Sequence, residues 1–410
     1  SHVPLDRNNA CSLCQCPEAK GFKNAAIGKN IQITPAIVAS SDQYLNIYDP
    51  KAEWQKEDNI DAGIDFRWGM TPNTSLNLTL NPDFSTIESD AGQLNVNKTF
   101  SLFYDEKRAF FLDNADYFTS NYNLVDTRNI ADPDYGVKLT GKDGNHSYGV
   151  FSANDTQTTF IKPGNLSSEL MSLAEESLST ALRYRFDYND DLTIGAISTL
   201  RTSDNYHNYV YGLDSKYRVD NSNSILFQAL NSDSSNQTLI DNSLNNKEDI
   251  SDQAYKIDLV HQSEYWNFTA GHQYIGKNFR ANLGYMPKAD FVESNVQVKR
   301  FFYGDHYNDG QSFWSEANIS SQWQIQHNID NQLIAKSINT RVELDGPLLS
   351  QFTLVLTHAK KVGLRYDKNI SGIDNNTTRF TENQLTFVTK FEPLSYLYSS
   401  IEINVGDKID

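Results

Sequence analysis

The fold class follows from the stretch Leu182-Arg-Tyr-Arg-Phe-Asp-Tyr188, in which apolar or aromatic side chains alternate with charged ones. Side chains that alternate with a period of two lie on opposite faces of an extended strand. A helix would instead repeat its apolar positions every three or four residues. The stretch therefore predicts a β-strand with one apolar and one polar face.

The same alternation recurs along the chain, for example in residues 266–274, 279–285 and 352–356. Clusters such as Asn189-Asp-Asp191 separate these runs and favour hairpins between antiparallel neighbours. The runs amount to roughly 15 to 18 strands of about ten residues, enough to cross a bilayer at a tilt, whereas strands of soluble sandwiches have about five or six. We therefore predict an all-β fold, an antiparallel transmembrane β-barrel. A soluble sandwich, β-helix or propeller is the alternative.

The composition points to the same class and argues against several partners. Only 39% of the 410 residues are hydrophobic, yet the chain has 22 Tyr and 22 Phe, which suits one large two-faced sheet better than a helical enzyme. With 35 basic and 52 acidic residues, the net charge of −17 disfavours nucleic acid as a partner. No apolar run approaches the roughly 18 residues of a transmembrane helix. We expect the partner of the apolar strand faces to be lipid of the bacterial outer membrane.

The alternation fails in an insert at about residues 81–120, where acids, bases and aromatic residues crowd together. Such a segment cannot face lipid, because its charges and irregular backbone would lack hydrogen-bond partners there. We predict that the insert folds inside the barrel or caps one mouth. The candidate plug, pore or ligand-contact residues are Asp83, Phe84, Glu88, Asp90, Glu106, Lys107, Arg108, Phe110 and Phe111.

The charges of the insert suggest how it is held. We expect Glu106, Lys107 and Arg108 to lie in the lumen and to pair with charged groups there, so that the insert narrows or plugs the pore. The expected partners are Asp83, Glu88, Asp90 and wall arginines such as Arg183 and Arg185. The same residue types also make contact surfaces for sugars or peptides. A purely architectural network that keeps the barrel in shape is the alternative.

Three cysteines lie in an irregular N-terminal tail, residues 1–30, which precedes the predicted barrel domain, residues 31–410. A glutamine follows the Cys-x-x-Cys pattern where haem attachment requires histidine, and a structural zinc site normally needs four ligands. We expect one disulfide and a spare thiol, or a mobile tail, with a redox or assembly role as the alternative. We predict no metal and no cofactor. The disulfide candidates are Cys11, Cys14 and Cys16.

Ordered motifs in residues 60–120 carry a family resemblance. They read Gly-x-Asp-x-x-x-Gly-x-Thr-Pro-Asn at 63–73, Asn-Pro-Asp-Phe-(x)3-Glu-x-Asp at 81–90 and Glu-Lys-Arg-x-Phe-Phe-Leu at 106–112, with a further match at 279–290. The chain resembles a large bacterial family of uncharacterised outer-membrane β-barrel domains, commonly found behind a family-nine carbohydrate-binding module. The resemblance implies a porin-like protein in the outer membrane of a Gram-negative bacterium.

Two features depart from that family. Only about thirty residues precede the first expected strand, so we expect that the carbohydrate-binding module has been removed, is a separate product, or never existed. Outer-membrane barrels usually finish on a strand with a terminal aromatic residue, whereas this chain ends Gly406-Asp-Lys-Ile-Asp410. Because an open sheet edge is untenable in lipid, we expect one or more closing strands to be missing or supplied by another chain.

The sequence carries no Gly-rich phosphate loop, no Gly-x-Ser-x-Gly elbow and no His-Glu-x-x-His pair. We therefore predict a non-enzymatic barrel that passes a solute or docks a partner protein. One alternative is a sheath or anchor for a periplasmic or surface partner in a secretion or electron-transfer complex. Another is a carbohydrate-active enzyme or a saccharide-binding protein, in which Glu88 and Glu106 could act as a carboxylate pair.

Overall fold

The structure is a computed structural model, and it describes most of the chain. The residues described are 30–44, 54–82, 101–236, 239–240, 243–244, 248–304, 314–347, 349–362, 379–394 and 396–407.

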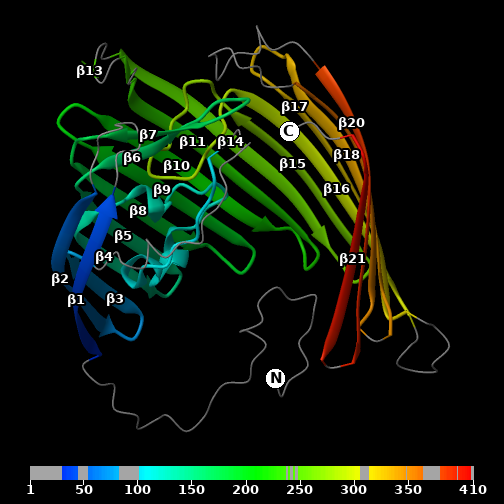
Figure 1. Cartoon of the computed structure of the whole chain (residues 1–410), viewed down its shortest axis with the longest axis horizontal. Coiled ribbons are helices and arrows are strands. Elements are labelled where there is room, and N and C mark those ends of the chain that lie inside the picture. Colours follow the sequence, from blue (N-terminus) through cyan, green and yellow to red (C-terminus); the bar gives the residue numbers. More distant parts are fainter. Residues whose placement is uncertain are drawn as a thin grey trace.

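The described residues form one 17-stranded antiparallel sheet, in which each strand pairs with the next one along the chain (Figure 1). The all-β, antiparallel prediction is confirmed. The strands are β1 Ile31–Tyr44, β2 Gln55–Thr71, β3 Thr74–Leu80, β4 Pro133–Asp143, β5 His146–Asp155, β8 Ser177–Asp187, β9 Leu192–Thr202, β10 His207–Arg218, β11 Asn223–Asn236, β14 Glu248–Gln262, β15 Trp266–Ile275, β16 Phe291–Tyr303, β17 Glu316–His327, β18 Leu333–Asp345, β19 Gln351–Val362, β20 Arg379–Leu394 and β21 Leu397–Gly406.

Short side-chain turns join neighbouring strands as the sequence predicts. Between β8 and β9, the side-chain oxygen of Asn189 accepts hydrogen bonds from the backbone N–H groups of Asp191 and Leu192, at 2.9 and 2.7 Å. Asp220 does the same between β10 and β11, where it accepts from the backbone N–H of Asn223 at 2.8 Å. Asn and Asp close turns in this way because their short side chains mimic a backbone acceptor. The turns are local, so the sheet is an up-and-down meander.

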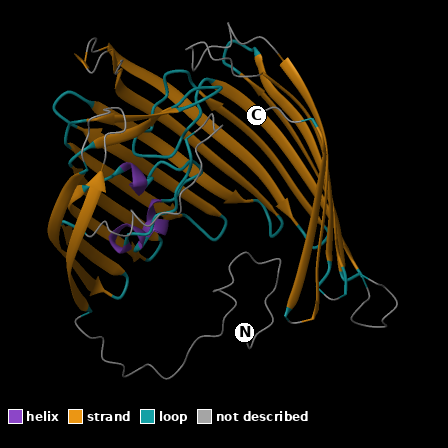
Figure 2. Ribbon diagram, viewed as in Figure 1, coloured by secondary structure: helices purple, strands orange, loops and turns teal. Residues whose placement is uncertain are grey.

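Smaller elements lie beside the large sheet. A hairpin of β6 Thr158–Lys162 and β7 Glu169–Leu173 follows β5, and β12 Leu239–Ile240 pairs with β13 Ser243–Leu244 beyond β11. Between β3 and β4 the chain forms α2 Ala109–Leu112 and two 3-10 turns, η1 Ala115–Phe118 and η2 Thr127–Asn129. Figure 2 shows these short helices against the concave face of the sheet.

We call residues 101–132 the insert and the concave face that it covers the inner face. The predicted insert stopped near residue 120, but irregular chain continues to Pro133, where β4 begins. Charge content does not mark this boundary, because residues 121–132 still carry three charged side chains, Asp126, Arg128 and Asp132. These residues stay irregular because they pack against another loop.

That loop, residues 276–290 between β15 and β16, corrects a second prediction. The alternation of residues 279–285 predicts a strand, but the segment has no strand pairing in the structure. Phe279 and Leu283 are instead buried, at 1% and 0% exposure, against the inner face. Asn282, which alternation would place on an exposed face, is also buried at 2% exposure, because this irregular chain packs on both sides. We call this segment the inner loop.

The two faces of the sheet have the opposite polarity to those of a soluble protein. On β8, Leu182 and Tyr184 are exposed on the outer face, whereas Ser179 and Arg183 are buried on the inner face. Among the described residues, no second layer covers the outer face (Figure 1). Its exposed apolar side chains include Leu178, Ile194, Leu213, Phe227, Ile257, Leu259, Phe268, Ile319, Trp323, Ile338, Leu356 and Leu385.

The described sheet does not close on itself. Strand β1 pairs with β2, and β21 pairs with β20, but β1 and β21 have no described pairing with each other. Figure 1 shows them on opposite sides of an opening. Because the sheet has an odd number of strands and all neighbours are antiparallel, β1 and β21 run in the same direction.

Candidate functional site

The insert crosses the inner face from β3 to β14. At one end, Asn77 of β3 donates to the carboxylate of Asp113 at 2.6 Å. Further along, the backbone N–H of Tyr122 donates to the side-chain oxygen of Gln228 on β11 at 2.9 Å, and the Tyr122 hydroxyl donates to the carbonyl of Tyr255 on β14 at 2.9 Å. The wall therefore holds the insert along its length and not only at its ends.

Glu106 and Arg108, both candidate residues, form an ion pair inside the insert. The Glu106 carboxylate accepts from the Arg108 guanidinium at 2.8 and 2.9 Å and from the Thr127 hydroxyl at 2.6 Å. Arg108, only 4% exposed, also donates to the carbonyls of Thr127 and Ile130, at 2.6 and 2.8 Å. A buried pair needs such additional hydrogen bonds to offset its desolvation. The pair ties the first part of the insert to its last turn.

The predicted pairing of the insert charges with wall arginines is wrong for Glu106, because its partner is Arg108. Arg183 pairs with Asp214 on β10, with nitrogen–oxygen distances of 2.5 and 2.9 Å. Lys107 is exposed, and its backbone N–H donates to the Glu106 carboxylate at 3.0 Å. The sequence could not show that the nearest acid in the chain is also the partner in space.

Phe110 and Phe111 anchor the insert to the wall. Both are buried, and their rings meet Phe151 of β5 at centroid distances of 6.3 and 5.8 Å. Two wall glycines make room for the insert. A Cβ at Gly136 would lie 2.8 Å from the Phe110 ring, and one at Gly149 would lie 3.0 Å from the ring of Phe118. Aromatic rings thus fill the space that missing wall side chains leave.

Lys138 of β4 holds the end of α2. Its ammonium group donates to the backbone carbonyls of Phe110, Phe111 and Asp113, and the side chain is 2% exposed. The last carbonyls of a helix lack partners within the helix, so a cation placed there satisfies them. Lys138 is therefore the wall residue that fixes the position of the short helix.

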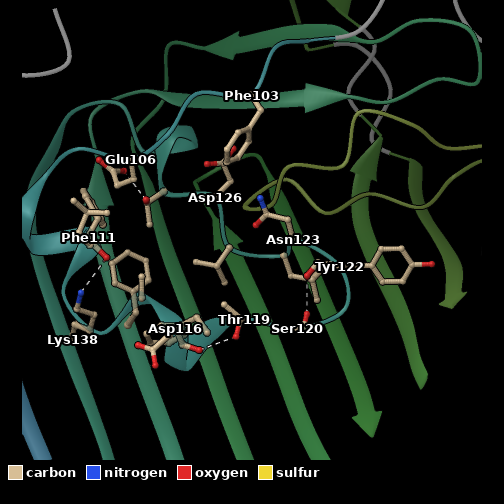
Figure 3. Close-up of a pocket in the computed structure, with 17 residues that line it drawn as sticks. Phe103, Glu106, Phe111, Asp116, Thr119, Ser120, Tyr122, Asn123, Asp126 and Lys138 are labelled. Carbon is tan, nitrogen blue, oxygen red and sulfur yellow. Dashed lines mark hydrogen bonds between the residues drawn. The ribbon is translucent and has the colours of Figure 1, made fainter. Parts of the chain in front are cut away.

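The folded insert encloses a cavity of about 560 Å³ (Figure 3). Figure 3 shows Glu106, Phe111 and Lys138 on one side of it and Tyr122 and Asp126 on the other. The remaining lining is largely apolar, with Leu112, Ala115, Phe118, Leu124, Val125 and Phe151 among the contributors. The cavity can hold a small solute with an apolar part.

Of the three carboxyl groups that line this cavity, those of Glu106 and Asp126 differ in their acid strength. Burial raises the pKa of Asp126 to about 6, and the nearby charge of Glu106 adds to the effect, although a hydrogen bond from the backbone of Arg128 opposes it. Burial also acts to raise the pKa of Glu106, but the hydrogen bonds and charge of Arg108 and the bond from Thr127 outweigh it, and that pKa is lowered. Of these two groups, Glu106 is therefore the fixed charge and Asp126 is the one that titrates near pH 6. Because the oxygens of Glu106 are already hydrogen-bonded, it is poorly placed as a hydrolase acid or base.

The inner loop lies against the insert. The backbone N–H of Asp126 donates to the carbonyl of Leu283 at 2.8 Å, and the backbone N–H of Tyr285 donates to the carbonyl of Asn123 at 3.0 Å. A Cβ at Gly284 would lie 2.4 Å from the Asn123 carbonyl oxygen, so only glycine fits this approach. The Tyr285 hydroxyl also donates to the carbonyl of Ser101 at 2.7 Å, so the inner loop contacts the start of the insert as well as its later part.

Sequence reasoning missed several buried charges on the wall. Arg201 and Asp155 are both fully buried and lie 3.3 Å apart, and Arg201 also donates to the carbonyl of Asn129 in the insert at 3.0 Å. Lys138 belongs to the same group. A signal for these residues was present in the sequence. Each is a charged residue at a strand position that the alternation assigns to the polar face, and the polar face is the one that the insert covers.

Part of the predicted set lies outside the described residues, so the structure does not place it. These residues are Asp83, Phe84, Glu88, Asp90, Cys11, Cys14 and Cys16. Within the described ranges, no group of three or more His, Cys, Asp or Glu side chains could hold a metal ion. No described helix has the length and apolar character needed to cross a membrane.

Comparison with known proteins gives one family match. Residues 40–138, which include the described insert, match the family described as Domain of unknown function (DUF5916). The match covers less than half of the chain. No curated protein sequence matches the chain.

Several solved structures share the general arrangement of strands at low identity. OccK11 (OpdR) of Pseudomonas aeruginosa has 9% identity and a TM-score of 0.41, with 92% of this chain and 86% of that chain covered. OccAB2 of Acinetobacter baumannii has 10% identity and a TM-score of 0.40, with 92% and 88% covered. The outer membrane protein opdK of P. aeruginosa has 12% identity and a TM-score of 0.35, with 92% and 89% covered. These likenesses are too distant to assign a function or a ligand.

Proposed function

We propose that the chain forms most of the wall of a β-barrel in the outer membrane of a Gram-negative bacterium, and that the insert and inner loop narrow its lumen. The barrel would pass a small solute and would not act as an enzyme. The observation that carries this proposal is the polarity of the sheet, which is apolar and uncovered outside but polar and buried inside.

The outer face supports a lipid environment. Exposed apolar patches on soluble proteins rarely exceed a few hundred Å², whereas here apolar side chains recur across almost all strands. Apart from β3, with 7 residues, the strands of the sheet have 10 to 17 residues, and a tilted strand crosses the hydrocarbon layer in about nine to eleven. Burying this surface in lipid provides the covering layer that the chain itself does not supply.

The insert supports a narrowed lumen rather than a mobile gate. Wall side chains from β3, β4 and β11 contact it, and the charged groups Lys138, Arg201 and Arg108 each bond to its backbone carbonyls. Figure 1 shows the insert on the side of the sheet that carries β3 to β11, away from β17 to β20. Solute would therefore pass between the fixed insert and the opposite wall.

Closure with antiparallel pairing throughout needs a further strand. A direct pairing of β1 with β21 would be parallel, because the two strands run in the same direction. One additional strand, from a further segment of this protein or from another chain, could pair antiparallel with both and give the even strand number that bacterial barrels usually have. It would also remove two edges that cannot remain unpaired in lipid.

The proposal is tested by removing the insert. Strands β3 and β4 are paired neighbours, with Leu80 opposite Tyr135, so a short Gly-Ser linker can replace residues 83–131 without separating them. We expect detergent-dependent extraction, heat-modifiable gel mobility and a several-fold larger single-channel conductance than that of the intact protein. Lys107→Ala is the matched control, since Lys107 is exposed.

Each arm of this test addresses one part of the proposal. An unchanged conductance after deletion of the insert would refute the narrowed pore. A water-soluble monomer with no heat-modifiable form would refute the membrane barrel itself.

A further inference from the structure

A second pocket, of about 390 Å³, lies on the inner face between the insert and the strands β4 to β11. We propose that it binds a small oxyanion, such as the carboxylate or phosphate group of a solute. The pocket would then select the charge of the solute that enters the lumen. As a selectivity element it rests on the proposed function, but anion binding itself does not require a pore. The charged residues of its lining are Lys142, Arg183, Arg185, Asp187, Asp214 and Lys216.

The charge balance of this pocket is opposite to that of the chain. Two of its four cations are neutralised, because Lys142 pairs with Asp187 at 3.1 Å and Arg183 pairs with Asp214 at 2.5 Å. Among the described residues, neither Arg185 nor Lys216 makes an ion pair or hydrogen bond, although the charge of Arg185 acts on the Asp187 carboxylate that Lys142 already bonds. Two formal positive charges therefore remain in a chain whose net charge is −17.

Strand register explains why Arg185 stays unpaired. Arg185 on β8, Gly195 on β9 and Asp214 on β10 are aligned in one row across the sheet, with Arg183 one inner-face position away. A Cβ at Gly195 would lie 2.5 Å from the Arg183 guanidinium and 2.6 Å from the Asp214 carboxylate. The glycine thus lets Arg183 reach across the row and take the acid that Arg185 would otherwise contact.

Two hydrogen-bond donors in the pocket lining also have no partner. They are the side-chain amide nitrogen of Asn121, which belongs to the insert, and the Nε of Arg183, and both atoms are buried. Arg183 as a whole is 5% exposed. Buried donors are almost always hydrogen-bonded, so donors left free beside two unpaired cations indicate a missing acceptor. An oxyanion supplies both negative charge and several acceptor atoms.

The location adds to the attraction. Field lines are focused in a concave site with low-dielectric walls, which raises the local concentration of ions of the opposite sign. Because the insert forms one side of the pocket, an anion bound there contacts both the fixed wall and the element that narrows the lumen. The acidic residues of the chain lie elsewhere or are already paired at this site.

The experiment measures binding of inorganic phosphate and of acetate to the detergent-purified protein by calorimetry, with choline as a cationic control. The test variant is Arg185→Gln combined with Lys216→Gln. The matched variant is Arg218→Gln, on the same strand β10, whose side chain pairs with Asp191 outside the pocket. We expect the anion affinity to fall roughly tenfold or more for each pocket cation removed, and therefore roughly a hundredfold or more in the double variant. The affinity of the matched variant should be unchanged.

The conservative variant Arg185→Lys with Lys216→Arg keeps both charges and should retain binding, which guards against a folding defect in the neutral variant. Failure of the wild-type protein to bind either anion, equal binding by the neutral variant, or equal loss in Arg218→Gln would each overturn the site. A protein that binds anions as expected but shows no channel conductance would refute the proposed function and leave the site intact.

Discussion

Replacement of Lys138 by methionine tests whether the wall holds the insert. The ammonium group donates to three backbone carbonyls at the end of α2 and is almost fully buried. A hydrogen bond from a charged donor contributes about 1.5–3 kcal/mol, but here three bonds share one ammonium, and the substitution also removes the cost of desolvating that charge. The expected net loss of insert docking is therefore about 2–4 kcal/mol.

Hydrogen exchange of the backbone amides in α2 measures this loss. The N–H groups of Phe111, Leu112 and Asp113 bond to carbonyls within the same turn, so they exchange only when the helix opens. A loss of about 2–4 kcal/mol corresponds to exchange that is roughly 30 to 700 times faster. Conductance should become noisier or larger at the same time, while the heat-modifiable mobility of the barrel is retained.

The control is Lys142→Met, four residues further along the same strand. Lys142 is half exposed and pairs only with Asp187, at 3.1 Å, so its loss should change docking by about 0–1 kcal/mol. The reasoning is refuted if Lys138→Met exchanges at the wild-type rate, or if both substitutions accelerate exchange equally.

Three further predictions concern other contacts. Gly284→Ala should push the inner loop away from Asn123 and weaken docking of the two segments by about 1–3 kcal/mol. The measurement is hydrogen exchange of the amides of residues 123–130, which should become faster. Exchange at the wild-type rate would contradict the close approach of Gly284 to Asn123. The pKa of Asp126 is about 6 in the folded insert against an ordinary 3.8, so the folded state holds the proton more tightly. Docking should thus weaken as the pH rises, by about 2 kcal/mol between pH 4 and 6 and by about 3 kcal/mol between the fully protonated and fully ionised limits, and Asp126→Asn should abolish that dependence in pH-resolved exchange. Trp323→Arg on the outer face should lower the free energy of unfolding by about 2–4 kcal/mol, measured by urea titration of the protein folded into lipid vesicles, whereas Asn295→Arg on the inner face should be tolerated. A larger loss for Asn295→Arg than for Trp323→Arg would argue against lipid on the outer face.

The local pattern was enough to predict the wall. Arg183 and Tyr184 point to opposite faces because neighbouring side chains in a strand always do, and the turn at Asn189 closes through its own side chain. Neither property depends on distant residues. For that reason the strand class, the antiparallel order and the sidedness of the sheet were all predictable.

The same pattern was misleading in the inner loop, because apolar side chains at alternate positions do not by themselves establish hydrogen-bond pairing between strands. Phe279 and Leu283 are buried as the pattern requires, but the backbone carbonyl of Leu283 accepts from the insert and not from a neighbouring strand. Which backbone lies alongside is decided by contacts far apart in the sequence. Periodicity contains no information about them.

The amino-acid sequence by itself therefore determined a two-faced antiparallel sheet interrupted by one charged, aromatic insert, because strand direction and turn formation are set by neighbouring residues. Only the tertiary structure decided that Glu106 pairs with Arg108, that Lys138 caps α2, and that Arg185 lacks a partner. Those outcomes depend on which residues the strand register aligns in one row and on which side chains the insert covers. Both are non-local, since they are fixed by packing between segments more than 150 residues apart in the sequence, with a separation of 184 residues between Ser101 and Tyr285.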